Sequence, residues 1–117
     1  MYEFPSSEEL SFLVGDTLIQ ICLDPYSTQF RFDQCQITVE QAVEQEIEGK
    51  IWRYECIAAE GPAIMLHRLV GKKIMAIDAQ PLRLSLTFDD GAILHVASEI
   101  CPYESGQISG HGKFIVF

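Results

Sequence analysis

The stretch Leu69–Ile77, LVGKKIMAI, repeats in kind the earlier stretch Leu13–Ile21, LVGDTLIQI, and this repetition decides the predicted fold. In each stretch a short apolar helical face leads to a glycine, and alternating apolar residues follow the glycine. The similarity continues downstream, where Leu86–Asp89 answers Phe30–Asp33. Because a repeated unit buries its apolar face against its twin, the chain is expected to consist of two similar units packed together.

Each unit predicts one short helix followed by strands. Ser6 and the acidic residues after it are typical of a helix N-terminus, and Gly15 is placed to end that helix in a left-handed conformation. Gly61-Pro62 and Gly71 delimit a second helix in the same way. The sequence Asp89-Asp90-Gly91 predicts a tight hairpin turn, because Asp-Gly supplies the positive φ values that such a turn needs.

The predicted fold is mainly β with two short helices, as a single domain of residues 1–117. It repeats an α-β-β-β-β unit over about 6–58 and 61–117. Eight mostly antiparallel strands can close as a β-sandwich or as a barrel. We favour a sandwich of two four-stranded meanders related by a pseudo-twofold axis. In this scheme Glu40–Gly49 and Ala97–Gly112 are long connections between the third and fourth strands of each unit.

The composition is typical of a soluble domain. The chain has 117 residues, of which 48% are hydrophobic, and this suits a core that forms without disulfides. No apolar run approaches the roughly 20 residues that a membrane-spanning helix requires. The N-terminal residues show neither the basic nor the apolar region of a secretion signal. We therefore expect a cytoplasmic protein.

The charge is strongly acidic, with 17 acidic residues against 8 basic residues and a net charge of −9. Nucleic acids and anionic lipids select basic surfaces, so neither is an expected partner. An acidic surface attracts a basic protein and speeds its encounter. The alternative interpretation is that the acidic residues only maintain solubility.

Residues that often carry catalysis or bind metals are scattered along the chain. The four cysteines are Cys22, Cys35, Cys56 and Cys101, and the three histidines are His67, His95 and His111. The cysteines form no C-x-x-C pair and are expected to be reduced and structural. No two histidines share a predicted element, and a dyad of His95 with Asp89 or Asp90 is only a weak possibility. No nucleotide-binding or nucleophile motif occurs, so we expect no enzyme activity, no cofactor and no metal.

The candidate binding residues lie in the two long connections, where the units differ most. They are Glu40, Glu44, Glu46 and Glu48 in the first connection, and Glu99, Tyr103 and Glu104 in the second. Loops of this length on a rigid sheet are common binding sites. An aromatic anchor with an acidic rim is a frequent recognition pattern. The alternative is that Tyr103 packs over an open end of the core.

The pattern L-V-G-K-K-I…L-T-F-D-D-G-x-x-L-x-V…Y-E, from Leu69 to Glu104, resembles a family of small bacterial domains of unassigned function. That resemblance implies a repeated fold of this kind and no catalytic residues. In size and acidity the chain also resembles the immunity proteins of bacterial toxin systems, including contact-dependent growth inhibition. Those proteins bind a cognate toxin domain, commonly a basic nuclease, and block its active site.

Two hypotheses of function follow from the sequence. In the first, the chain is an immunity protein that occludes a basic toxin domain, and it is itself a monomer or a weak dimer. In the alternative, it is a small-molecule-binding or sensing domain with a pocket at the end of the sandwich, or a structural adaptor.

Overall fold

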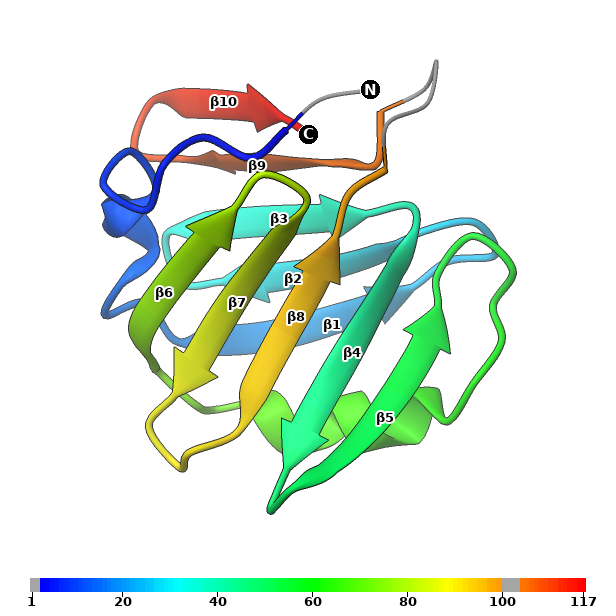
Figure 1. The fold of residues 1–117 in the computed structure, drawn as a ribbon. Helices are drawn as coiled ribbons and strands as arrows, with labels where there is room; N and C mark the ends of the chain where they lie inside the picture. The colour runs from blue at the N-terminus through cyan, green and yellow to red at the C-terminus, as the bar shows by residue number, and fades with distance from the viewer. Residues whose placement is uncertain (1–2, 100–103) are drawn as a thin grey trace.

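The computed structural model describes residues 3–99 and 104–117, which form ten β-strands and two short 3-10 helices (Figure 1). The elements in chain order are η1 (Ser11–Leu13), β1 (Leu18–Leu23), β2 (Thr28–Phe32), β3 (Cys35–Val39), β4 (Ala42–Ile47), β5 (Lys50–Glu55), η2 (Ala63–Leu69), β6 (Ile74–Gln80), β7 (Arg83–Phe88), β8 (Ile93–Ala97), β9 (Gly106–Gly110) and β10 (Lys113–Val116). The fold is therefore mainly β, as predicted from the sequence.

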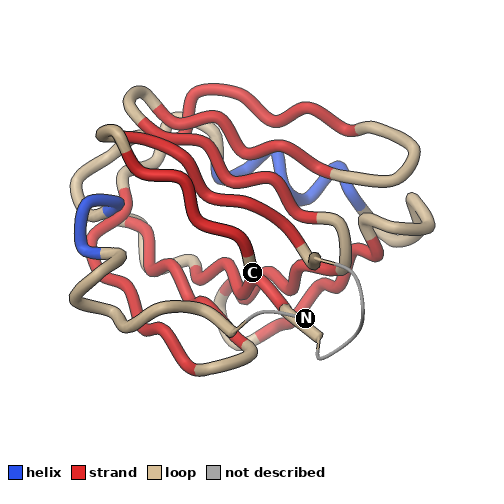
Figure 2. The backbone as a smooth tube through the Cα atoms, turned by 90° about the horizontal axis from the view of Figure 1, so that it is seen from above, coloured by secondary structure: helices blue, strands red, loops and turns tan. Residues whose placement is uncertain are grey.

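The strands form two antiparallel sheets, packed as two layers (Figure 2). Sheet I has the order β1-β2-β3-β9-β10, and sheet II has the order β5-β4-β8-β7-β6. Each sheet thus takes three strands from one half of the chain and the final hairpin from the other half. No ladder between described strands closes the two sheets into a barrel. The arrangement is a sandwich in which the last hairpins are exchanged, rather than two four-stranded meanders.

Hydrogen bonds between the two halves obey an approximate twofold relation. A residue of the first half corresponds to one 56 positions later in the sequence (15 to 71, 18 to 74). The Gly15 N–H donates to the Ile74 carbonyl at 2.8 Å, and the Gly71 N–H donates to the Leu18 carbonyl at 2.7 Å. Each bond is therefore the counterpart of the other when the two halves are interchanged. The halves therefore meet through equivalent contacts where β1 and β6 begin.

The exchanged hairpins also correspond to each other, with a shift of 63 positions (48 to 111, 49 to 112). Glu48 and Gly49 connect β4 to β5 with φ values of 50° and 81°. His111 and Gly112 connect β9 to β10 with φ values of 51° and 74°. Two successive positive φ values define the tight turn that matches the twist of antiparallel strands.

The prediction of eight strands was wrong, because β4 and β9 form within the two segments that the sequence predicted to be connections. In β4 the outward residues are glutamates and one inward residue, Gln45, is polar, so the apolar alternation is weak. In β9 the residues Gly106 and Gly110 interrupt the alternation. Both segments become strands because the neighbouring strands β8 and β3 satisfy their backbone groups.

The prediction of two helices was also wrong in part. The Glu9 N–H donates to Ser6 Oγ at 3.2 Å, but in a turn that precedes the helix. The helix η1 itself has only three residues, its N-cap residue is Leu10, and no side chain caps it, whereas η2 has seven residues. Helices this short depend on packing for their stability. Gly15 and Gly71 follow them with φ values of 91° and 88°, in the left-handed region that the sequence predicted.

The inner faces of the two sheets share one hydrophobic cluster. Phe30 and Ile37 of sheet I and Leu86 and Leu94 of sheet II are completely buried within it. Burial of each such side chain contributes roughly 1.5–3 kcal/mol. At one end of the sandwich the rings of Phe4 and Phe117 stack with centroids 4.4 Å apart. In the part of the chain that the structure describes, no helix is both long and apolar enough to cross a membrane.

Candidate partner-binding surface

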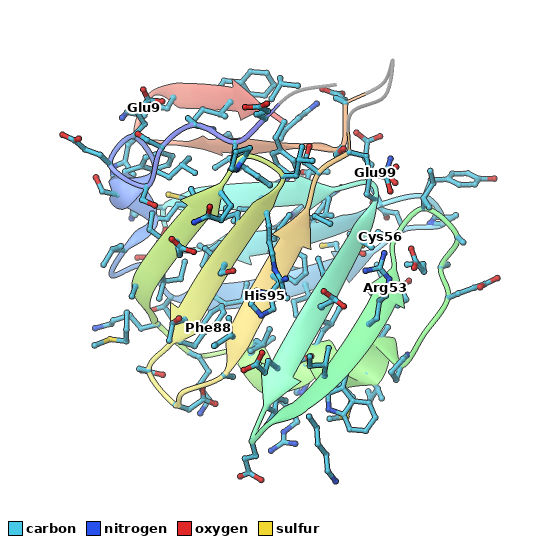
Figure 3. The ribbon with its side chains drawn as sticks, in the orientation of Figure 1. Glu9, Arg53, Cys56, Phe88, His95 and Glu99 are labelled. Carbon is cyan, nitrogen blue, oxygen red and sulfur yellow. The ribbon has the colours of Figure 1, made fainter. Side chains whose placement is uncertain are left out.

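The two sheets share the pattern of their inner faces but differ on their outer faces. The outward residues of β3 and β9 in sheet I are neutral, namely Gln36, Thr38, Gln107 and Ser109, although the neighbouring strand β2 carries the exposed Arg31. In sheet II the equivalents of Thr38, Gln107 and Ser109 are the titratable residues His95, Glu44 and Glu46. Arg53 and Arg83 lie on the same face, where Figure 3 labels Arg53 and His95. Since both outer faces are built on the same scaffold, this difference is not required by the fold.

His95 lies at the centre of the outer face of sheet II. Its Nδ1 is 2.7 Å from Ser85 Oγ on β7, and its Nε2 is 3.5 Å from Glu46 Oε1 on β4. His95 Nε2 is buried and has no hydrogen-bond partner among the described residues, so its contact with Glu46 is not a hydrogen bond. Only 12% of the His95 side chain is exposed. The histidine therefore contacts Ser85 and Glu46 rather than Asp89 or Asp90, the partners considered from sequence.

Glu44 lies between two arginines on the same face. Its carboxylate oxygens are 3.8 Å from Arg53 Nη1 and 3.6 Å from Arg83 Nη2. Arg53 also donates through Nε to Glu55 at 2.6 Å. The side chains of these pairs are about a third to a half exposed, so each pair contributes only about 0–1 kcal/mol to stability. A partner's charged group can replace such a weak pair at little cost.

A second group of carboxylates lies at the end of β4 where the chain crosses from sheet I to sheet II. The Glu40 N–H donates to the Ser105 carbonyl at 2.7 Å, which holds Glu40 beside the segment that leads into β9. Burial, and then the negative charge of Glu104, raise the pKa of the Glu40 carboxyl. Glu99, at the end of β8, is close enough to Arg53 to contribute to the raised pKa of that guanidinium, after the larger effect of its hydrogen bond to Glu55.

The structure thus brings together most of the acidic residues predicted from sequence. We call Glu40, Glu44, Glu46, Glu99 and Glu104 the acidic surface. Glu48 is separate, because it occupies the tight turn at the opposite end of β4 from Glu40. Tyr103 lies outside the described residues.

Sequence reasoning missed the residues that surround the acidic surface, namely Arg53, Arg83, His95 and Ser85. Their proximity follows from the register, in which Ser85 pairs with His95, His95 with Glu44, and Glu44 with Arg53. It also missed Gln45, which is buried at the position that Ile108 occupies in sheet I, and whose Nε2 donates to the Met65 carbonyl at 2.9 Å. If β4 had been predicted as a strand, its pairing with β5 and β8 would have placed these residues beside the acidic surface.

Two cavities lie elsewhere on the molecule. One, of about 270 Å³, is polar and includes Phe12, Asp16 and His111 in its lining. The other, of about 190 Å³, is apolar and lies between β1 and η2. Both are smaller than the roughly 300–1,000 Å³ of most small-molecule sites. Across residues 3–99 and 104–117, no three His, Cys, Asp or Glu side chains converge as a metal ion would need.

The described cysteines are free thiols. Cys35 lies beside the polar cavity's Asp16; burial, followed by its hydrogen bond to Asp16, raises the pKa of the Cys35 thiol to about 12. A thiol with so high a pKa is a poor nucleophile at neutral pH.

Comparison of the chain with protein-family models, with curated proteins and with solved structures found no match.

Proposed function

We propose that this chain is an immunity-type protein that binds and neutralises a cognate bacterial toxin domain, in particular a basic nuclease, by covering its active site. The acidic surface is the contact region in this proposal. The observation that carries it is the placement of the Glu40 and Glu104 carboxylates beside each other, where the 2.7 Å hydrogen bond from the Glu40 N–H to the Ser105 carbonyl holds the two segments together. A carboxylate that is partly desolvated and faces a second carboxylate gains stability when a cation approaches.

A basic partner is attracted at two stages. At long range, the net charge of −9 increases the rate of encounter with a cationic surface. At contact, a lysine or arginine beside Glu40 and Glu104 relieves their mutual repulsion and forms new ion pairs. Coupling energies of roughly 1.5–7 kcal/mol are known for close charge pairs between proteins. A few carboxylates are therefore sufficient to dominate the affinity.

The test is co-expression with the product of the gene immediately upstream, followed by purification of the complex and a growth assay of toxicity. The decisive variant is the double substitution Glu40→Gln with Glu104→Gln. The matched control is Glu8→Gln with Glu9→Gln, which removes the same charge from exposed residues near η1. Figure 3 shows Glu9 well apart from Glu99.

We expect the wild-type protein to form a one-to-one complex and to abolish toxicity. The first double variant should bind at least about tenfold more weakly, which is the effect of losing a single pair worth about 1.4 kcal/mol. The control should change the affinity by less than about twofold, because exposed charges at a distance are screened. Absence of a complex, or toxicity that this protein does not reduce, rules the proposal out.

A further inference from the structure

Strand β6 forms one edge of sheet II, and the N-terminal segment of the chain covers part of this edge. The Phe4 N–H donates to the Pro81 carbonyl at 2.9 Å, and the Ala79 N–H on β6 donates to Ser7 Oγ at 2.8 Å. The segment runs antiparallel to β6, since Phe4 lies beside residue 81 and Ser7 beside residue 79. The β6 edge is therefore closed by one backbone N–H donor, from Phe4, and one side-chain acceptor, from Ser7.

The corresponding edge of sheet I, strand β1, cannot be closed in the same way. By the 56-residue shift, Ala63 corresponds to Ser7, whose hydroxyl accepts the hydrogen bond at the β6 edge. Leu23 corresponds to Ala79, whose N–H donates that bond. The Asp24 N–H donates to the Ser27 carbonyl at 2.9 Å across the β1–β2 hairpin. Because pairing alternates along an antiparallel strand, the N–H of Leu23 points away from β2, toward the edge. Ala63 has no hydroxyl to accept it.

The segment before η2 is also diverted from this edge. The Glu55 N–H donates to the Glu60 carbonyl at 2.7 Å, so the segment lies against the end of β5 instead. Gly61 approaches β5 so closely that a Cβ atom there would overlap the Arg53 carbonyl oxygen. The counterpart of the N-terminal segment is therefore held at another strand.

An apolar groove remains beside β1, which we call the β1 groove. Its lining includes Ile21 and Leu23 of β1 and Ala63, Ile64 and His67 of η2, and its volume is about 190 Å³. Ile64 is 79% exposed and Leu23 is 52% exposed.

Strand β1 is also the edge that carries no charged residue, whereas β5, β6 and β10 each contain at least one. Charged side chains on an edge strand oppose pairing with another chain, and β1 has none.

We propose that the β1 groove binds an extended peptide segment of a partner protein, which adds to sheet I as an antiparallel strand. A backbone carbonyl of that segment accepts the Leu23 N–H, and an apolar side chain enters the groove beside Ile64. Strand addition of this kind takes affinity from the backbone and specificity from the side-chain pocket. The inference goes beyond toxin neutralisation, because the lining of the β1 groove includes none of the residues of the acidic surface.

Charge indicates which segments fit. The last turn of η2 carries His67 and Arg68, in a molecule that is otherwise acidic. The peptide that covers the equivalent β6 edge is flanked by acids, Glu3 on one side and Glu8 on the other. The preferred partner segment is therefore apolar in its centre and acidic at one end.

The test uses a display library of random seven-residue peptides, panned against the purified protein. We expect enrichment of peptides with alternating apolar residues and an acidic flank. The best peptide, made synthetically, should shift the amide NMR signals of Ile21, Leu23 and Ala63. Ile64→Glu should weaken its binding at least about tenfold, since it removes an apolar contact. Ala63→Ser should weaken it too, because the new hydroxyl accepts the Leu23 N–H.

Met75→Glu is the matched control, because Met75 is 57% exposed on the other edge strand, β6. It should leave the affinity unchanged. Failure of the library to yield a peptide overturns the proposal, as does a peptide that binds both groove variants as tightly as the wild type. A wild-type dimer that Ile64→Glu dissociates in light scattering also overturns it, since a second copy is then the occupant.

Discussion

The exchange of the final hairpins is tested most severely by Gly106→Ala. Gly106 begins β9 and pairs with Val39 of β3, a contact that exists only if the second half of the chain contributes its hairpin to sheet I. A Cβ atom at this position would overlap the Thr38 carbonyl oxygen and would lie 2.5 Å from Phe117 Cζ. Ordinary van der Waals contact of a Cβ atom is 3.4–4 Å.

The size of the effect follows from the atoms involved. Overpacking of a dense core costs about 1–3 kcal/mol. Because the Thr38 oxygen belongs to the backbone, it cannot rotate away, and β9 must withdraw from β3. That movement weakens neighbouring hydrogen bonds, such as the 2.7 Å bond from the Glu40 N–H to Ser105, at about 0.5–1.5 kcal/mol each. With two such bonds lost, the total is about 2–6 kcal/mol, against a typical stability of about 5–15 kcal/mol.

The assay is urea denaturation followed by circular dichroism. Gly112→Ala is the control, since a Cβ atom at Gly112 would meet no other atom within 4 Å, and only the φ of +74° opposes alanine there. That substitution should cost about 1–2 kcal/mol. If Gly106→Ala destabilises the protein no more than Gly112→Ala, β9 does not lie against β3 and the described topology is wrong.

Two further predictions concern titratable groups. The folded-state pKa of Glu40 is raised above its unfolded value, so ionisation weakens the fold as pH rises through the unfolded pKa, and the penalty is absent below it. Glu40→Gln should therefore raise the free energy of unfolding at pH 7 by up to about 1 kcal/mol and have little effect on it near pH 3. Urea titrations at both pH values measure this, and an equal effect at both would show that the ionisation of Glu40 is not the cause. Iodoacetamide at pH 8 should alkylate the partly exposed Cys22 at least about tenfold faster than Cys35, whose pKa is about 12, as measured by mass spectrometry. Equal rates would show that Cys35 is not buried as described.

Local signals in the sequence predicted the local structure well. Gly15 and Gly71 adopt positive φ, and the alternating apolar segments of the first three strands in each half form strands. These features depend on near neighbours in the chain. The choice of partner strand does not, so the exchange of the last hairpins was not predictable from periodicity.

The acidic surface was predictable only as a set of residues. Composition identifies Glu40, Glu44 and Glu46, but in a segment that the sequence predicts to be a loop. Their arrangement depends on β4 being a strand between β5 and β8, and this places Arg53 and His95 beside Glu44. The positions of these side chains relative to one another depend on the pairing of β4 with β5 and β8, and composition does not predict that pairing.

The central claim is that the acidic surface attracts and holds a basic partner. The most direct measurement is the stopped-flow association rate with the product of the gene immediately upstream, at roughly 50 mM and 500 mM salt. The predicted result is a rate that falls at least about tenfold at high salt for the wild type, and by a smaller factor for Glu40→Gln with Glu104→Gln, whose net charge is less negative by two. A rate independent of salt, or a double variant as salt-sensitive as the wild type, would contradict the account.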